Sequence, residues 1–286
     1  AKEAERQAGV PVRRDPPPPP MFTPFKLRDL LIPNRIVVSP MCQYCAGDGT
    51  VDDWHLQHLA SRAVGGAGLV YAEMTNVSAD ARISKGCAGL YKAEHVDAWK
   101  RIVDFVHIRT PGKIAIQLGH AGRKGASKPL WEGDAEPLEG GAWDLVSASP
   151  LPYFPDRSQT PREMTRADMD EVVADYSRAT EYAEAAGFDL LELHMAHGYL
   201  LAAFISPLTN QRSDEYGGSL ENRARFWLET IEKVKTAIGH ESAVAVRLSV
   251  DQVMGTEGIE AHEDGYKFVE LASNSGMVDL WDLNLS

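Results

Sequence analysis

Two histidines and a tyrosine follow one another closely after an apolar run, in the segment His194-Met195-Ala196-His197-Gly198-Tyr199. Two imidazole N–H donors that converge on one oxygen can polarise a carbonyl and stabilise a developing enolate. A phenol has an unperturbed pKa near ~10, so Tyr199 stays protonated at neutral pH and can give a proton to an α-carbon. The alternatives are a metal held by the histidines, although His-x-x-His lacks the spacing of the helical His-Glu-x-x-His motif, and histidines satisfied by backbone groups.

A second candidate segment leaves an earlier apolar run and reads Ser39-Pro40-Met41-Cys42-Gln43-Tyr44. A loop of this kind can line a planar ligand with its backbone. A thiol beside a redox-active ring can tune that ring by weak hydrogen bonding. The alternative is an ordinary turn at the end of a strand, with a buried cysteine.

A third candidate segment is Gln117-Leu118-Gly119-His120-Ala121-Gly122-Arg123-Lys124. A carboxamide offers both donors and an acceptor, so Gln117 could recognise a ring edge such as the uracil-like half of a flavin. The two glycines permit close approach of the backbone. The alternative is a polar strand end that meets solvent.

Arg247 lies within the apolar run of residues 243–248. Because a guanidinium does not lose its charge, burying it requires an anionic partner. That partner is either Glu192 or Asp251 in a salt bridge, or the negative charge of a reduced flavin. The polar loop of residues 210–223 could contact substrate or be structural, and Ser219 within it can cap the helix that follows.

The elements that must position these groups alternate along the chain. Strands are expected at residues 35–39, 68–72, 113–117, 189–194, 243–248 and 278–283, and helices at residues 54–64, 94–107, 165–186, 219–238 and 261–272. This alternation predicts an α/β fold with a parallel sheet. The absence of a Gly-x-Gly-x-x-Gly motif after the first strand argues against a doubly wound, dinucleotide-binding sheet. Polar groups at the carboxyl ends of several strands, Glu73 among them, favour a (β/α)8 TIM barrel, truncated after about the sixth strand.

Composition narrows the function further. The 286 residues are 44% hydrophobic with a formal net charge of −12, which disfavours nucleic-acid binding. Three cysteines do not suggest a disulfide framework, so a cytoplasmic location is expected. There is no apolar run long enough for a membrane span and no signal-peptide pattern. Five prolines at residues 16–20 indicate either a disordered tail or a linker. We expect residues 1–20 to link to an upstream domain and residues 21–286 to form a partial barrel.

Four segments, in this order, resemble the Old Yellow Enzyme family and specifically its thermophilic-like subclass. They are Ser39-Pro40-Met41-Cys42-x-Tyr44, Gln117-Leu118-x-His120-Ala121-Gly122-Arg123-Lys124, His194-x-x-His197-Gly198-Tyr199-Leu200, and the run from Ser206 to Ser219. The resemblance implies a TIM barrel with FMN at its carboxyl mouth and NADH or NADPH as reductant. It implies an ene-reductase that acts on the C=C bond of a conjugated carbonyl, usually as a homo-oligomer.

The same resemblance assigns roles to individual residues. His194 and His197 would hold the substrate carbonyl, Tyr199 would be the proton donor, and Tyr44 would close over the substrate. Met74 stands where the family has a small residue, which puts that flavin contact in doubt. The residues expected to bind the flavin are Ser39, Pro40, Met41, Cys42, Met74, Gln117 and Arg247.

A narrower resemblance concerns the Pro-rich lead-in. It looks like the junction in fused aryl-CoA enzymes, such as 2-aminobenzoyl-CoA monooxygenase/reductase and bifunctional salicylyl-CoA 5-hydroxylase, where an FAD monooxygenase precedes the reductase. This implies a CoA thioester as substrate. Because the family binds the FMN phosphate after the seventh and eighth strands, residues 1–286 alone are expected to bind FMN poorly. Two rival hypotheses are a metal-dependent barrel hydrolase using His194 and His197, and a non-catalytic module that docks to a monooxygenase.

Overall fold

A curved, six-stranded parallel sheet forms the centre of the computed structural model, which describes residues 2–11, 16, 18–133, 135–239 and 242–285. The strand order is β10-β9-β8-β5-β4-β3, and every neighbouring pair is parallel. The six strands are those expected from the sequence, in chain order. Their bounds are Val37–Val38 (β3), Leu69–Asn76 (β4), Lys113–Gly119 (β5), Leu190–Met195 (β8), Val244–Asp251 (β9) and Leu280–Leu285 (β10).

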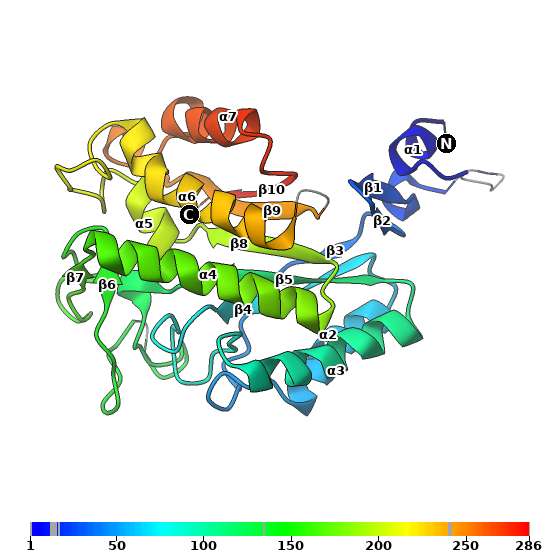
Figure 1. Ribbon diagram of the computed structural model, residues 1–286, viewed down its shortest axis with the longest axis horizontal. Coiled ribbons are helices and arrows are strands. Elements are labelled where there is room, and N and C mark those ends of the chain that lie inside the picture. The colour runs from blue at the N-terminus through cyan, green and yellow to red at the C-terminus, as the bar shows by residue number, and fades with distance from the viewer. Residues whose placement is uncertain (1, 12–15, 17, 134, 240–241, 286) are drawn as a thin grey trace.

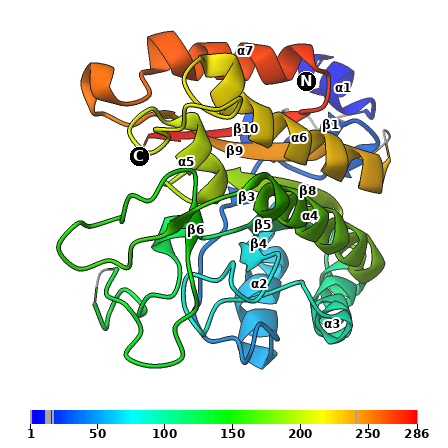
Figure 2. The ribbon, with the colours of Figure 1, turned by 60° about the vertical axis from the view of Figure 1, so that its left-hand side comes forward.

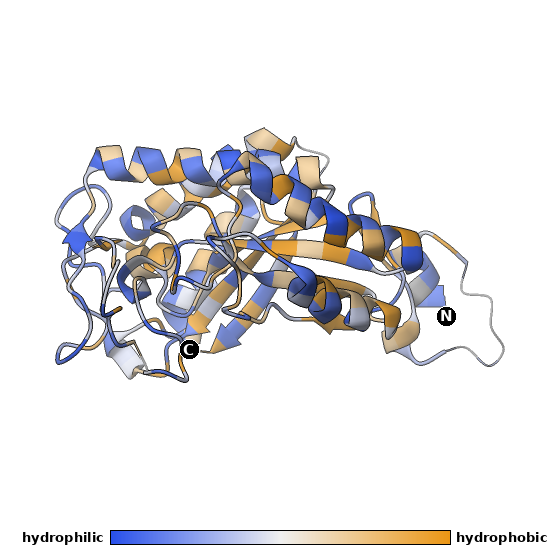
Figure 3. Cartoon of the chain, turned by 90° about the horizontal axis from the view of Figure 1, so that it is seen from below, coloured by the Kyte–Doolittle hydropathy of each residue, from blue (hydrophilic) through white to orange (hydrophobic). Residues whose placement is uncertain are grey.

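Five long helices lie around one face of the sheet, in the order of the strands that they follow (Figures 1 and 2). They are Asp53–Val64 (α2), Ala93–Arg109 (α3), Arg166–Ala186 (α4), Leu220–Ile238 (α6) and Tyr266–Asn274 (α7), which follows a π-helical turn at Ala261–Gly265 (η4). Hydrophilic and hydrophobic stripes alternate along the helices (Figure 3) because each buries only one face. The α/β fold with a parallel sheet is therefore confirmed.

Local sequence explains where the longest helix begins and ends. Thr165 accepts a hydrogen bond from the backbone N–H of Asp168, whose carboxylate accepts from the N–H of Thr165, so the predicted capping box is present. Gly187 ends α4 at φ 89°, a left-handed conformation that glycine adopts without strain. Ser219 caps α6 as predicted.

Side chains alternate between the two faces of each strand. In β5, Ile114, Ile116 and Leu118 belong to the main core between sheet and helices. Ala115 and Gln117 point to the opposite, inner face. The inner face is apolar near the amino ends of the strands and becomes polar toward their carboxyl ends, which is where the candidate residues lie.

An antiparallel hairpin, absent from the sequence-based prediction, covers the amino ends of the strands. Its strands are Phe25–Leu27 (β1) and Leu30–Ile32 (β2). Leu27 and Ile32 pack against Tyr71 and other inner-face residues. A short helix, Lys2–Ala8 (α1), lies beside the hairpin (Figure 1). The expected linker of residues 1–20 falls partly outside the described residues and stays a prediction.

The remaining elements belong to the connecting segments. They are Pro20–Phe22 (η1), Gly122–Lys124 (η2), Val146–Ser147 (β6), Arg162–Glu163 (β7), Leu200–Ile205 (α5) and Gly255–Glu257 (η3). The excursion between β5 and α4 and the short helix α5 lie at the end of the sheet opposite the hairpin (Figure 1). Within the described ranges, no helix has the length and apolar character needed to cross a membrane.

Candidate active site

His194, His197 and Tyr199, here called the mouth cluster, come together where β8 ends. The ring centroids of His194 and Tyr199 are 4.9 Å apart, and those of the two histidines are 5.0 Å apart. His197 has a φ of 58° and Gly198 a φ of 70°, so the chain turns sharply after β8. A non-glycine residue in this left-handed region is strained, and such strain is concentrated at functional sites. The turn places Tyr199 at the start of α5.

The hydrogen bonds of the mouth cluster define a chain of neutral imidazoles. The backbone N–H of Ala196 donates to Nδ1 of His194 at 3.2 Å, which places the proton of His194 on Nε2. That Nε2 lies 3.1 Å from Nδ1 of His197, so His194 donates and His197 accepts. Nε2 of His197 then carries a proton and lies against the side-chain amide of Asn284. The amide oxygen of Asn284 has no partner among the described residues. If the amide is rotated by half a turn, this oxygen accepts from Nε2 of His197.

Burial keeps the mouth cluster uncharged. It lowers the pKa of His194 well below its ordinary value, and it lowers the pKa of His197 to about 4, with Arg247 and Lys124 adding to the effect. Burial also raises the pKa of Tyr199, so its phenol keeps its proton. The cluster can therefore offer N–H and O–H donors at neutral pH without carrying charge.

The loop after β3 packs against the mouth cluster from the other side. Cys42 and Tyr44 join Met74, Cys87 and Tyr199 in one apolar cluster. Burial raises the pKa of Cys42, which keeps it a neutral thiol. The carboxylate of Glu73 accepts from the backbone N–H of Gln43 at 3.2 Å and so anchors the loop.

The sequence-based candidates around Cys42 differ in exposure. Met74 is 2% exposed, so its larger side chain is accommodated within the apolar cluster around Cys42. Ser39 lines a cavity on the inner face of the sheet, whereas the side chain of Met41 is exposed and that of Pro40 half-buried.

One layer below the mouth cluster, the inner face carries Tyr71, Gln117, Glu192, Arg247 and Asp282, here called the interior layer. Strand register brings these residues together, because Gln117 is opposite Glu192 and Arg247 is opposite Asp282. The amide nitrogen of Gln117 donates to Oε1 of Glu192 at 2.7 Å. Nε of Arg247 lies 3.4 Å from a carboxylate oxygen of Asp282.

The ion pair of Arg247 with Asp282 corrects the sequence-based choice of Glu192 or Asp251 as its salt-bridge partner. Asp251 instead accepts from the backbone N–H groups of Val253 and Ala261, which fixes the loop after β9. One carboxylate oxygen of Glu192 accepts from Gln117, and burial followed by the charge of Asp282 raises the pKa of Glu192 to about 7.

Sequence reasoning missed Tyr71, Asp282 and Asn284 altogether. Their signal was the two-residue period of the strands, because Glu192 and His194 share a face of β8 as Asp282 and Asn284 share a face of β10. Three buried atoms of the interior layer have no hydrogen-bond partner among the described residues: Tyr71 Oη, Glu192 Oε2 and Arg247 Nε. A cavity of about 240 Å³ is lined by Tyr71, Glu192, Asp282 and four further residues.

The polar loop of residues 210–223 braces the fold. Asn210 donates to the carbonyl oxygens of Phe204 and Tyr216, both at 2.7 Å. Arg212 donates to the carbonyl oxygens of Ala148 and Met164 and so ties the loop to the β5–α4 excursion. The structure thus favours the structural interpretation of this loop over a substrate contact.

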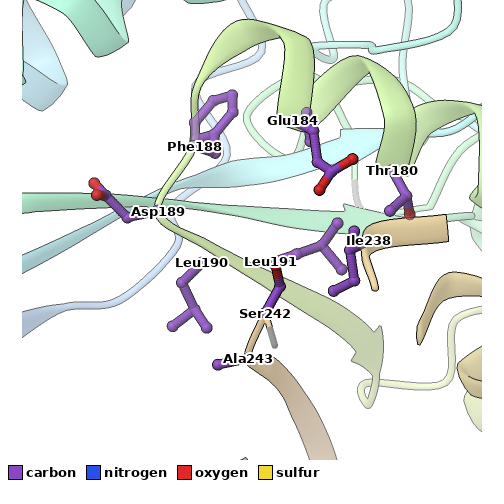
Figure 4. A pocket seen from close by; sticks show the side chains of 10 residues that line it. Thr180, Glu184, Phe188, Asp189, Leu190, Leu191, Ile238, Ser242 and Ala243 are labelled. Carbon is purple, nitrogen blue, oxygen red and sulfur yellow. The ribbon is translucent and has the colours of Figure 1, made fainter. Parts of the chain in front are cut away.

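Two further pockets differ in their relation to the mouth cluster. A cavity of about 140 Å³ opens beside it and is lined by Tyr44, Lys124, Lys128, Tyr153 and Tyr199, among others. A smaller pocket of about 60 Å³ lies between α4 and the start of β8, where Phe188 and Asp189 line it (Figure 4). Because Asp189 precedes β8 and His194 lies near its other end, that pocket is not part of the candidate site. In the described ranges, no group of three or more His, Cys, Asp or Glu side chains is placed to hold a metal.

The chain is similar to known proteins over almost its whole length. Residues 20–284 match the profile of the NADH:flavin oxidoreductase / NADH oxidase family. An NADPH dehydrogenase of a Geobacillus species is 43% identical over 217 residues, which are 75% of this chain and 59% of that protein. An NADPH dehydrogenase of Listeria monocytogenes is 40% identical over 271 residues, which are 91% of this chain and 75% of that protein. The chain thus spans about three fifths of the length of the first of these relatives.

Solved structures with the same fold include a 2-naphthoyl-CoA reductase in complex with 2-naphthoyl-CoA, with a TM-score of 0.83 and 25% identity. That match covers 93% of this chain and 40% of the other. Morphinone reductase in complex with tetrahydroNAD matches with a TM-score of 0.77 and 29% identity, over 93% of this chain and 74% of the other. The resemblance to Old Yellow Enzymes is confirmed, and the chain belongs to the NADH:flavin oxidoreductase / NADH oxidase family.

Proposed function

We propose that this chain is the catalytic part of an FMN-dependent ene-reductase that uses NADH or NADPH to reduce the C=C bond of a conjugated carbonyl compound. The observation that carries the proposal is the placement of the mouth cluster directly above the interior layer. Neutral donors for a carbonyl oxygen and a protonated phenol therefore lie next to polar groups suited to a flavin ring edge. Family membership supports the same reaction class.

The residues present fit the ring half of FMN. Gln117 uses its amide nitrogen on Glu192, so its oxygen is the atom suited to accept from an N–H of the pyrimidine edge. Nε of Arg247 is a buried donor without a hydrogen-bond partner among the described residues, which suits a ring edge that becomes negative. When bound, FMN would take hydride from NADH or NADPH and deliver it to the substrate's β-carbon. The residues proposed to hold the ring are Ser39, Pro40, Met41, Cys42, Met74, Gln117 and Arg247.

The mouth cluster would perform the remaining chemistry. His194 would donate to the carbonyl oxygen from Nε2 once its bond to Nδ1 of His197 opens, and His197 would donate from Nε2 in exchange for its contact with Asn284. Tyr199 would donate its proton to the α-carbon, and its raised pKa keeps that proton in place until then. Tyr44, which lies edge-on to Trp131 with ring centroids 5.7 Å apart, would close over the substrate.

We also propose that the sheet belongs to a closed (β/α)8 barrel. β3 and β10 are its two edge strands in the described part of the chain, and the cavity of about 240 Å³ is lined by residues from both. Further strands between them would complete the barrel and supply loops for the FMN phosphate. The upstream monooxygenase, the linker role of residues 1–20 and the homo-oligomer stay predictions.

An aromatic CoA thioester is the substrate that we propose within this class. One supporting observation is the structural similarity to the 2-naphthoyl-CoA reductase. The other is the cavity beside the mouth cluster, which combines Tyr44 and Tyr153 with the cation Lys124, whereas Lys128 pairs with Glu136 and Glu139. Aromatic walls suit a flat acyl group, and Lys124 suits an anionic carrier.

Tyr199→Phe tests the proposed function. Loss of the general acid should slow reduction of a conjugated substrate by roughly 10²- to 10⁴-fold, whereas reduction of the flavin by NADPH should change little. Rapid-mixing absorbance at the flavin band separates the two half-reactions. The matched control is Tyr176→Phe, which removes a buried phenol hydroxyl from α4 and should leave both half-reactions unchanged. An equal loss in both half-reactions of Tyr199→Phe would contradict the proton-donor role.

A further inference from the structure

Glu192 has a position that the proposed reaction does not yet use. It lies on β8 two residues before His194 on the same face and is fully buried. One carboxylate oxygen accepts from Gln117, and the other has no hydrogen-bond partner among the described residues. We propose that Glu192 is a positioning residue for the flavin site, which fixes the amide of Gln117 and sets the charge beneath the ring. This inference rests on the proposed function.

The first part of the role is the orientation of Gln117. A carboxamide can be turned over without changing its shape, so an isolated glutamine presents either oxygen or nitrogen to a ring. Glu192 offers only acceptors to Gln117 when it is ionised. The 2.7 Å bond therefore holds the amide nitrogen toward Glu192 and directs the oxygen away from it. The site is prepared for an N–H donor on the ring.

The second part of the role follows from the charges that face Glu192. Tyr71 faces it from β4, Gln117 from β5, Arg247 from β9 and Asp282 from β10. With Glu192 ionised, two carboxylates and one guanidinium leave one net negative charge in the interior layer. With Glu192 protonated, the interior layer is neutral.

The charge of the interior layer should decide how well the site tolerates a reduced flavin. Reduction makes the pyrimidine half of the ring more negative, and a buried charge nearby acts with little screening. An ionised Glu192 therefore opposes reduction, and a protonated Glu192 does not. Burial and the neighbouring Asp282 raise the pKa of Glu192 to about 7. The change of charge then falls in the physiological range.

Two substitutions separate the two parts of the role. Glu192→Gln keeps an acceptor oxygen for Gln117 but removes the charge, and Glu192→Leu removes both. The measurement is the flavin midpoint potential between pH 5.5 and 8.5 in the flavin-loaded protein, together with the dissociation constant of oxidised FMN. Wild-type protein should show an extra break in the potential near neutral pH. In flavin-free wild-type protein, the carboxyl infrared band of Glu192 should titrate in the same pH range. This band should be missing from both variants.

For Glu192→Gln we expect the break in the midpoint potential to disappear. At pH 8 this variant should bind reduced FMN about tenfold more tightly than the wild-type protein does, while its affinity for oxidised FMN is unchanged. For Glu192→Leu we expect oxidised FMN to bind about tenfold more weakly, because Gln117 loses its fixed orientation. The control is Asp175→Asn, which removes from α4 a buried carboxylate of raised pKa that pairs with Arg178 and should change neither quantity.

The outcomes distinguish this inference from the proposed function. A Glu192→Gln protein that keeps the wild-type potential at every pH would overturn the charge role, since a merely structural glutamate would behave in that way. Unchanged FMN binding in a folded Glu192→Leu protein would overturn the positioning role. A wild-type protein of full barrel length that binds no flavin would overturn the proposed function and the inference together.

Discussion

The mouth cluster and the interior layer are adjacent sets of polar side chains, yet they differ in how far their polar atoms are hydrogen-bonded. In the mouth cluster, the two histidines bond to each other and are neutral. In the interior layer, Glu192 is fully buried, Arg247 and Asp282 are partly buried, and three polar atoms have no hydrogen-bond partner among the described residues. Buried polar atoms are usually paired, so these three atoms distinguish the interior layer from the mouth cluster.

This difference indicates a division of labour. A neutral pair of donors that is satisfied at rest can exchange one hydrogen bond for another when a carbonyl oxygen arrives, at little cost in desolvation. An interior layer with unpaired donors and acceptors is suited to a permanently bound polar partner, such as a flavin ring edge. Under the proposed function, the mouth cluster would exchange substrate and the interior layer would retain the cofactor. The predictions below test that division.

The largest effect is expected from the histidines. Replacing His194 or His197 by alanine should slow reduction of a conjugated substrate by about 10²- to 10³-fold, the usual loss when one donor to a developing oxyanion is removed. Because the two imidazoles bond to each other, the double variant should lose little more than either single variant. Single-turnover kinetics give all three values. The interpretation would be wrong if the rate of flavin reduction fell as much as the rate of substrate reduction. It would also be wrong if the loss in the double variant equalled the product of the two single losses, because the histidines would then not act as a unit on the substrate.

The next effect concerns the stability of the interior layer. The pKa of Glu192 is raised from 4.5 to about 7 in the folded protein, so the folded state holds a proton that the unfolded state has lost between these values. The contribution of Glu192 to the free energy of unfolding is fully present below pH 4.5. It is lost as the pH rises to about 7, and the loss amounts to at most about 3 kcal/mol. Urea unfolding of wild-type protein and Glu192→Gln at pH 5 and 8 isolates the contribution. The free energy of unfolding should fall less with pH in the variant, and parallel curves would refute the raised pKa.

The six strands, the five long helices and the residues of the mouth cluster could be predicted because the signals are local. Apolar periodicity defines the strands and helices, and the mouth cluster lies within six consecutive residues. The interior layer draws one residue from each of five strands. Its partners depend on strand register, so the sequence did not reveal that Arg247 pairs with Asp282.

The hairpin at the amino ends of the strands was missed for a different physical reason. Its turn contains Arg28 at φ 48°, in a conformation that usually calls for glycine or asparagine. Arg28 is held there by an ion pair with Asp279, which lies 251 residues away in the chain. A turn that is stabilised by a distant partner carries no local signal. The same holds for Asn284, whose contact with His197 joins β10 to the loop after β8.

The smallest expected effect concerns Lys124, which bridges the mouth cluster and the cavity beside it. Its ammonium donates to the carbonyl oxygen of His197 at 2.9 Å and lies 4.9 Å from the ring centroid of Tyr199. The pKa of His197 is lowered to about 4 by burial first, then by Arg247 and Lys124. Lys124→Met should therefore raise the pKa of His197 only slightly, which leaves the imidazole neutral at pH 7. Proton NMR titration of the His197 ring measures this, with Lys100→Met on the exposed face of α3 as the control. A His197 that became charged near pH 7 would mean that the cation, and not burial, keeps the mouth cluster neutral.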